Sequence, residues 1–97
     1  MNDLIQSVEK WAWKRGLSDP YNSPKQMLKV MEEVGETAKA LAEGNHHELK
    51  DGIGDVVVTL IILAMQNELG LEECLQSAYD EIKARTGKTI NGVFIKD

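Results

Sequence analysis

Acidic residues near the middle of the chain are the side chains best suited to chemistry, and they fall into two clusters. They are Glu32, Glu33, Glu36, Glu48, Asp51 and Asp55. If each cluster lies on a helix, Glu33 and Glu36 share one face, and Asp51 and Asp55 share one face of the next helix. Carboxylates without thiolates are the hard oxygen ligands that suit Mg²⁺ or Mn²⁺. Two such pairs, brought together, would form a divalent-metal site.

A turn between the clusters provides a way of bringing them together. Glu36 lies as far before Gly44 as Gly52 lies after it, and Glu33 lies as far before Gly44 as Asp55 lies after it. Two antiparallel helices joined at this turn would therefore place four carboxylates between them. The alternative is a solvated acidic face, which is common on helices. Spacing alone leaves both interpretations open.

Capping and turn signals predict the elements that position these residues. Ser23 as N-cap and Pro24 as the first helical residue open a helix, and Asn45 with Glu48 repeats the capping pattern. The first expected helix ends near Gly16. The other three span Ser23 to about Glu43, His46 to about Leu69, and Leu71 to about Arg85. We therefore predict a single all-α domain over residues 1–97, resembling a four-helix bundle, with helices two and three antiparallel around the carboxylates.

Apolar residues are expected to form the core on a face separate from the chemistry. In the second helix they recur at helical spacing as Met27, Met31, Val34, Ala38 and Leu41. In the third helix the run VVVTLIILAM is apolar on all sides, and its continuity with charged helical turns favours a helix over a strand. Such a helix in a small domain implies that another subunit covers one face. We expect a homodimer or a homotetramer.

Composition excludes several other classes of protein. With 97 residues and a net charge of −5, the chain has no basic footprint for nucleic acid. The apolar run is shorter than the roughly 20 residues that a membrane span needs. The single cysteine, Cys74, rules out an internal disulfide and a thiolate zinc site, and we expect it in the core. The polar, acidic N-terminus differs from an export signal, so a cytoplasmic location is expected.

At Glu32-Glu33-Val34-Gly35-Glu36, followed by Gly54-Asp55 and a long apolar helix, the chain resembles the MazG-like nucleotide pyrophosphohydrolases. These belong to the all-α NTP pyrophosphatase superfamily, whose pattern is EExxE and then ExxD. The resemblance extends to a tryptophan-containing first helix, to Gln26 and Lys29 ahead of the acidic motif, and to the segment from Lys83 to Asn91.

The resemblance implies Mg²⁺-dependent hydrolysis of a nucleoside triphosphate to the monophosphate and pyrophosphate, with a role in cleansing the nucleotide pool. Glu33 and Glu36 match the ExxE ligands, and Asp55 matches the Asp of ExxD. Either Glu32 or Glu33 would accept the proton of the attacking water. Substrate contacts are implied for Gln26, Lys29, Lys83, Arg85 and Asn91.

The chain departs from the family pattern at one position. Gly52 stands where the Glu of ExxD is expected, and Asp51 is the nearest carboxylate. Asp51 is therefore our expected fourth ligand, sharing a face with Asp55. The alternative is a non-catalytic helical accessory module that has lost a metal ligand at Gly52.

Two further groups have alternative interpretations. Trp13 cannot share the inward face of the first helix with Trp11, so it either covers a ligand or fills a packing contact. Lys83 and Arg85 either meet phosphate oxygens or serve as favourable cations at a helix C-terminus.

Overall fold

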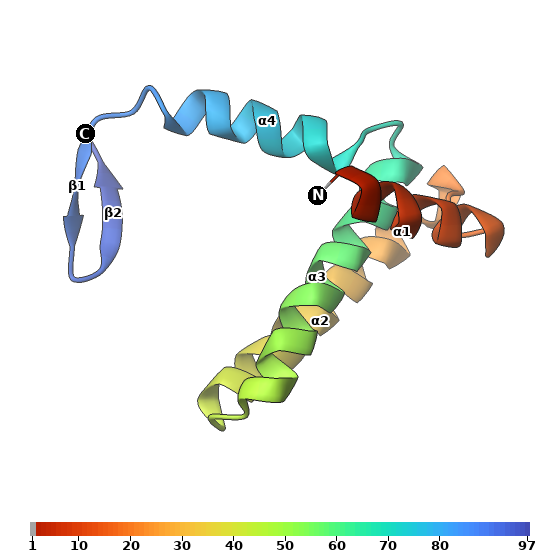
Figure 1. Cartoon of the computed structure of the whole chain (residues 1–97), viewed down its shortest axis with the longest axis horizontal. Coiled ribbons are helices and arrows are strands. Elements are labelled where there is room, and N and C mark those ends of the chain that lie inside the picture. Colours follow the sequence, from red (N-terminus) through yellow and green to blue (C-terminus); the bar gives the residue numbers. More distant parts are fainter. Residues whose placement is uncertain (1) are drawn as a thin grey trace.

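A computed structural model describes residues 2–97, with only the backbone described for Asn2. Its elements are α1 (Asn2–Lys14), the 3₁₀ helix η1 (Pro20–Asn22), α2 (Ser23–Ala42), α3 (His46–Gln66), α4 (Leu71–Ile82), β1 (Gly87–Ile90) and β2 (Val93–Lys96). The predicted all-α fold with four main helices is confirmed, and a small antiparallel hairpin follows it (Figure 1). The apolar run after Asp55 is helical, as predicted.

The long helices α2 and α3 form an antiparallel pair, which is the main packing unit of the chain (Figure 1). Gly44, at a φ of 68°, lies in the turn between them, where a left-handed backbone favours glycine. The Asn45 side chain accepts a hydrogen bond of 3.1 Å from the backbone N–H of Glu48 and so caps α3. The turn and cap signals in the sequence thus correctly predicted this helical hairpin.

Gly52 marks a close approach between α2 and α3. A Cβ atom at this position would lie 2.5 Å from Thr37 Oγ1, nearer than real Cβ contacts allow. The Thr37 hydroxyl donates a 2.7 Å hydrogen bond to the Glu33 carbonyl, which holds it in place at the crossing. A glycine at this position therefore has a packing reason. We call the contact between Thr37 and Gly52 the seam.

The predicted core stripe of α2 is wrong for the single chain. The buried residues of α2 are Val30, Glu33 and Ala40, on the face that meets the seam. Met31, at the centre of the predicted stripe, is 61% exposed. Met27, Val34 and Leu41 are also exposed. The close seam turns the face with the small and polar residues towards α3, so the apolar stripe points away.

The first helix and the loop after it lie against the other end of the pair. Ile5 and Ala12 are the buried residues of α1, whereas Trp11, expected in the core, is 46% exposed. Ser23 was also misassigned: the 3₁₀ turn at Pro20–Asn22 runs into α2, so Ser23 is already helical and Asn22 occupies the N-cap position. The Ser23 hydroxyl instead accepts a 2.8 Å hydrogen bond from the Asn67 amide.

The C-terminal part projects away from the helical pair as an arm, made of α4 and the β1–β2 hairpin (Figure 1). Asn91 and Gly92, at φ of 50° and 79°, form the turn of the hairpin. No residue of α4 or of either strand is buried, and Cys74, expected in the core, is exposed. Within residues 2–97 no single helix is long and apolar enough to cross a membrane. Only α3 and α4 taken together reach that length and composition, and a 101° bend separates them.

Candidate active site

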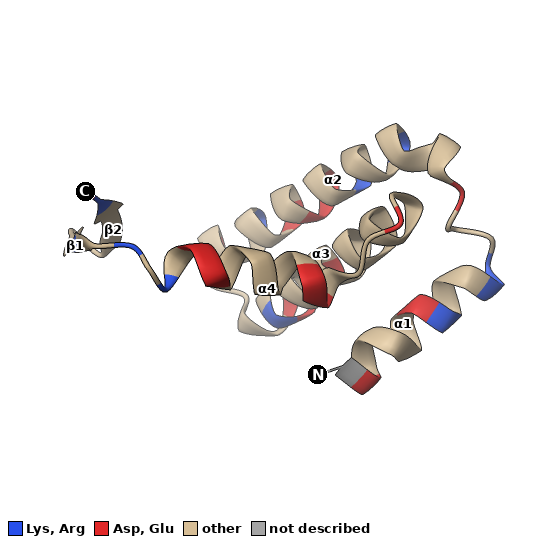
Figure 2. Ribbon diagram, turned by 90° about the horizontal axis from the view of Figure 1, so that it is seen from above, with Lys and Arg blue, Asp and Glu red and all other residues tan. Residues whose placement is uncertain are grey.

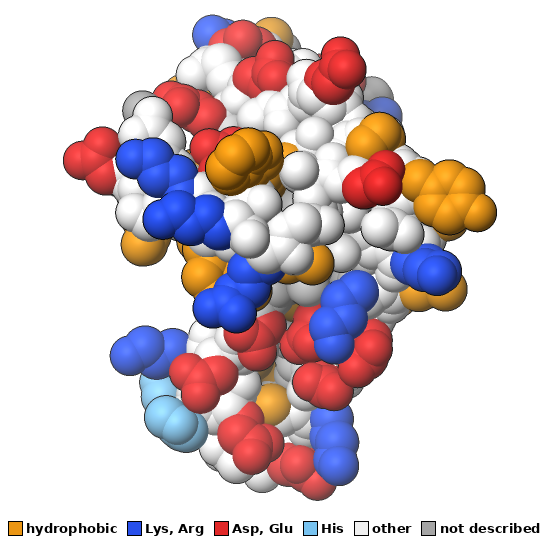
Figure 3. All heavy atoms as spheres, turned by 90° about the vertical axis from the view of Figure 1, so that its right-hand side faces the viewer, with side chains coloured by type: hydrophobic (Ala, Val, Ile, Leu, Met, Phe, Trp, Pro, Cys, Tyr) orange, Lys and Arg blue, Asp and Glu red, His pale blue; other side chains and the backbone are white. Residues whose placement is uncertain are grey.

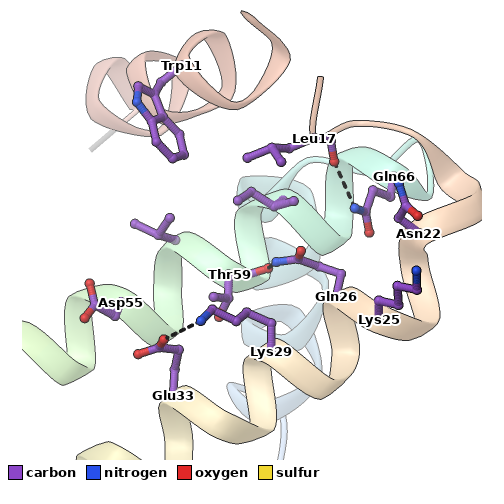
Figure 4. Close-up of a pocket in the computed structure, with 12 residues that line it drawn as sticks. Trp11, Leu17, Asn22, Lys25, Gln26, Lys29, Glu33, Asp55, Thr59 and Gln66 are labelled. Atoms are coloured by element: carbon purple, nitrogen blue, oxygen red, sulfur yellow. Dashed lines mark hydrogen bonds and ion pairs between the residues drawn. The ribbon is translucent and has the colours of Figure 1, made fainter. Parts of the chain in front are cut away.

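A cavity of about 580 Å³ opens between α1, α2 and α3 (Figure 4). We call it the main cavity. Its lining residues are Trp11, Leu17, Asn22, Lys25, Gln26, Lys29, Glu33, Asp55, Val58, Thr59, Ile62 and Gln66. Volume and lining are those of a small-molecule pocket: apolar walls with a few convergent polar groups.

Two polar contacts organise the α2 wall of this cavity. Lys29 Nζ lies 3.4 Å from a carboxylate oxygen of Glu33, whose side chain is only 11% exposed, and 3.5 Å from Glu32. Glu32 and then the hydrogen bond to Glu33 raise the pKa of Lys29 above its ordinary value, so this ammonium stays charged. Nearer the start of α2, the Gln26 amide donates a 3.0 Å hydrogen bond to the Thr59 carbonyl on α3. These contacts hold Gln26, Lys29 and Glu33 against the cavity.

A second cavity, of about 350 Å³, lies farther along the helical pair towards the turn. We call it the acidic cavity. It is lined by Glu36, Lys39, Glu48, Asp51, Gly52 and Asp55. Figure 2 shows acidic residues on both α2 and α3, and Figure 3 shows acidic side chains gathered over this end of the molecule. Asp55 lines both cavities, so the two spaces adjoin at this residue. It also lines a third cavity of about 720 Å³, larger than the main cavity, between α1 and α3.

The donors of the acidic cavity fit a hard divalent cation in their chemistry, since they are carboxylate oxygens with one lysine among them. Among residues 2–97, however, no three His, Cys, Asp or Glu side chains lie close enough together to hold an ion as they stand. Asp51 instead contacts His47 Nε2 at 3.3 Å, with 62% of its side chain exposed. Exposed carboxylates on helices turn easily, and like charges keep them apart when nothing neutralises them.

The remaining predicted site residues lie outside both cavities. Glu32 pairs with Lys29 on the exposed side of α2. Trp13, 70% exposed, lines a separate shallow apolar hollow beside Met65. Three predicted contacts belong to the arm: Lys83 pairs with Asp80 at 3.0 Å, Arg85 pairs with Glu81 at 3.1 Å, and Asn91 forms the hairpin turn. One chain therefore brings together Gln26, Lys29, Glu33, Glu36, Asp51 and Asp55 only.

The cavity also contains residues that sequence reasoning had not assigned to a site. They are Trp11, Asn22, Lys25, Thr59 and Gln66. A signal existed for two of them, because Thr59 and Gln66 are polar residues seven apart in an otherwise apolar helix, and follow Asp55 on one face. Both are buried. A polar stripe on the apolar helix was thus the overlooked indication.

The fold and the site together define an all-α domain in which a helical hairpin joins an acidic cavity to a ligand-sized pocket. The model of the MazG nucleotide pyrophosphohydrolase domain matches residues 22–89, and the chain belongs to this family. It is 39% identical over 69 residues to an uncharacterized 18.2 kDa protein in the rep-hol intergenic region of Haemophilus phage HP1 (strain HP1c1). That match covers 71% of this chain and 42% of the phage protein. No solved structure matches the chain.

Proposed function

We propose that the chain hydrolyses a nucleoside triphosphate to the monophosphate and pyrophosphate with the help of a divalent cation, Mg²⁺ or Mn²⁺. Membership of the MazG family supports the reaction class. The observation that carries the proposal is the position of Asp55, shared by the main cavity and the acidic cavity. A nucleoside in the first and phosphates over the second would bring the bond to be cleaved beside this carboxylate.

The main cavity offers groups that suit a nucleotide. Trp11 on α1 faces the space across from α2 and offers an aromatic surface to a base (Figure 4). Lys29 stands on the α2 wall beside Glu33, where its ammonium group would meet phosphate oxygens. The net charge of −5 makes this lysine important, because the chain otherwise repels a polyanion.

The acidic cavity would hold the cation through Glu36, Asp51 and Asp55, with Glu33 on the other side of Asp55. A bound cation would neutralise phosphate charge and lower the pKa of a water molecule. Of the two expected proton acceptors, Glu33 lines the main cavity and Glu32 does not. We therefore assign proton acceptance to Glu33, with Lys29 fixing the orientation of its carboxylate.

Gly52 does not favour the non-catalytic alternative as strongly as the sequence pattern indicated. The seam leaves no room for a Cβ at this position, so packing against Thr37 accounts for the glycine without a loss of activity. Asp51, one residue earlier, lines the acidic cavity and can take the ligand role.

A direct experiment is to incubate the full chain with each ribo- and deoxynucleoside triphosphate and to measure pyrophosphate, with Mg²⁺, with Mn²⁺ and with excess EDTA. We expect release with either metal and none with EDTA. The matched pair is Glu36→Gln, in the acidic cavity, and Glu43→Gln, exposed at the end of α2 and outside both cavities. The first should nearly abolish release and the second should preserve it. No pyrophosphate from any nucleotide would contradict the proposal.

We also propose that the working form is a homodimer or homotetramer. The exposed apolar stripe of α2 (Met27, Met31, Val34 and Leu41) is too large a surface to leave in water on one helix. Lys83, Arg85 and Asn91 would then reach a substrate only in another copy, because the arm carries them away from the cavities of their own chain (Figure 1). Trp13 would fill a subunit contact. Sedimentation of a stable monomer at micromolar concentration would contradict the assembly.

A further inference from the structure

Gln66, at the end of α3, has a side-chain oxygen without a hydrogen-bond partner. The residue is 3% exposed, and its amide nitrogen donates a 2.9 Å hydrogen bond to the Leu17 carbonyl. A carbonyl only accepts, so the nitrogen must face Leu17 and the oxygen must face elsewhere. That oxygen, Oε1, is buried and has no partner within residues 2–97. A buried acceptor left unpaired is costly, and such groups need a reason.

The residue that carries the unpaired oxygen lines the main cavity. Gln66 lines this cavity together with Asn22, Lys25 and Gln26, at the end away from Asp55 (Figure 4). Figure 4 shows the Gln66 amide with its nitrogen towards Leu17 and its oxygen on the side of Gln26. The nitrogen of Gln26 is committed to the Thr59 carbonyl, so this side chain too has an acceptor oxygen to offer. This end of the cavity therefore offers two amide oxygens as acceptors, beside the donors of Lys25 and Asn22.

A ligand that satisfies Gln66 must bring an N–H or O–H donor to this end. If the phosphates lie near Asp55, as in the proposed function on which this inference rests, the base of the nucleotide lies near Gln66. Cytosine and adenine carry an amino group at the pairing edge of the ring, where uracil and hypoxanthine carry an oxo group. Uracil and hypoxanthine also carry a ring N–H beside the oxo group, so the discrimination acts at the exocyclic position. Where that position faces Gln66, an oxo group places two acceptors against each other.

We infer that Gln66 selects nucleotides with an amino-bearing base, cytosine or adenine, over the matching oxo bases. Burial strengthens this selection, because bulk water does not compete for the oxygen. A site built around a hydrogen bond rejects an analogue that lacks it, since its own polar group is then left unsatisfied. The hydrogen bond to Leu17 fixes the orientation of the amide and so keeps the oxygen available.

The test compares two substrate pairs that differ only at the amino or oxo group: CTP with UTP, and ATP with ITP. For the wild-type chain we expect kcat/KM to be roughly 10-fold or more higher for the amino member of each pair. Gln66→Met keeps the shape but removes the acceptor, and should bring both ratios to about one. Equal kcat/KM values within both wild-type pairs, or an undiminished preference in Gln66→Met, would overturn the inference.

One further variant separates base selection from tethering of the loop. Asn67→Ala removes the neighbouring tether to Ser23 Oγ without touching the main cavity, and should leave both ratios unchanged. A merely structural Gln66 would scale both members of each pair equally. Loss of the preference in Asn67→Ala would count against selection by the Gln66 oxygen.

A binding measurement distinguishes failure of this inference from failure of the proposed hydrolysis. CMP and UMP are titrated into the full chain, with the fluorescence of the tryptophans as the signal, because Trp11 lines the cavity. Tighter binding of CMP that Gln66→Met abolishes would support the inference even if no triphosphate is cleaved. Equal affinity for CMP and UMP, or no binding of either, would overturn it.

Discussion

The seam between α2 and α3 and the arm after residue 70 differ in what each needs to be stable. The seam is completed within one chain: Gly52 and Thr37 bring the helices into close contact, and Glu33 and Val30 are buried beside them. The arm has a helix of 12 residues and a two-stranded hairpin, and none of its side chains is buried. A helix this short and an isolated hairpin are both marginal in water. The candidate site therefore lies where the chain packs on itself, whereas the arm is the part that the proposed assembly would stabilise.

The difference also separates two uses of apolar residues. Around the seam, the buried residues of α2 are small or polar and lie on the side of the cavities, whereas the methionines of α2 are exposed. In the arm, Leu75, Tyr79 and Ile82 lie on one side of α4 and are about half exposed. The exposed apolar surface on both parts supports the proposed assembly of several copies.

The largest expected effect is at Asp55, where the two cavities of the self-sufficient half meet. Asp55→Asn should lower pyrophosphate release by about 100-fold or more, since it removes a charged ligand from the proposed cation site. The metal-free melting temperature should hold or rise, because carboxylate repulsion is relieved. Asp3→Asn, exposed at the start of α1 and outside both cavities, is the matched control and should keep full activity. An unfolded Asp55→Asn with unchanged activity per folded molecule would make Asp55 structural.

Asp51 tests whether the site tolerates a glycine at position 52. Asp51→Ala should reduce activity about as severely as Asp55→Ala, and additional Mg²⁺ should restore part of it because the defect is in cation affinity. The measurement is kcat/KM as a function of Mg²⁺ concentration. A mild loss in Asp51→Ala beside a complete loss in Asp55→Ala would limit the ligands to three carboxylates and leave Asp51 as the partner of His47.

The dependence of the arm on a partner is tested by placing charge on its apolar side. Leu75→Lys should weaken the assembly about 10-fold or more in sedimentation equilibrium, because an apolar side chain of this size contributes roughly 1.5–3 kcal/mol when buried. Gln76→Lys, one residue further on the exposed helix, should leave the dissociation constant unchanged. Equal behaviour of the two variants would show that α4 takes no part in the assembly.

The seam itself is tested by adding one methyl group. Gly52→Ala should cost about 1–3 kcal/mol of unfolding free energy, because its Cβ would press on Thr37 Oγ1. Gly54→Ala has no neighbouring atom within 4 Å, and should gain up to about 1 kcal/mol from helix propensity. Urea titration measures both. Thr37→Ala combined with Gly52→Ala should recover part of the loss; no recovery would place the strain elsewhere.

The helices were predictable from the sequence because caps, turns and glycine stops act locally. Asn45 caps α3, and Gly44 lies in the turn between α2 and α3, as the sequence indicated. Helix boundaries were harder to predict where two signals competed. Serine is a typical N-cap residue, but the 3₁₀ turn that begins at Pro20 runs directly into α2, so Ser23 is already helical.

Which face of each helix is buried was not predictable, because it depends on contacts between distant residues. Apolar periodicity placed Met31 inside, whereas the approach of Gly52 to Thr37 turned the other face inward. For the same reason Trp11, and not Trp13, lines the main cavity. The acidic motif itself was readable, and the structure places Glu36, Asp51 and Asp55 around one cavity. The sequence did not show that Lys83 and Arg85 lie on the arm, paired with Asp80 and Glu81 and away from the cavities, because that depends on how α4 is placed relative to the helical pair.

The most direct test of the central claim is to identify the products by ³¹P NMR while the full chain acts on CTP in the presence of Mg²⁺. The account predicts that CMP and pyrophosphate form in equal amounts and that Asp55→Asn forms neither at a comparable rate. Cleavage to CDP and orthophosphate would contradict it, because attack would then fall on the terminal phosphate rather than beside Asp55. Equal turnover by wild type and Asp55→Asn would likewise remove the junction of the two cavities from the chemistry.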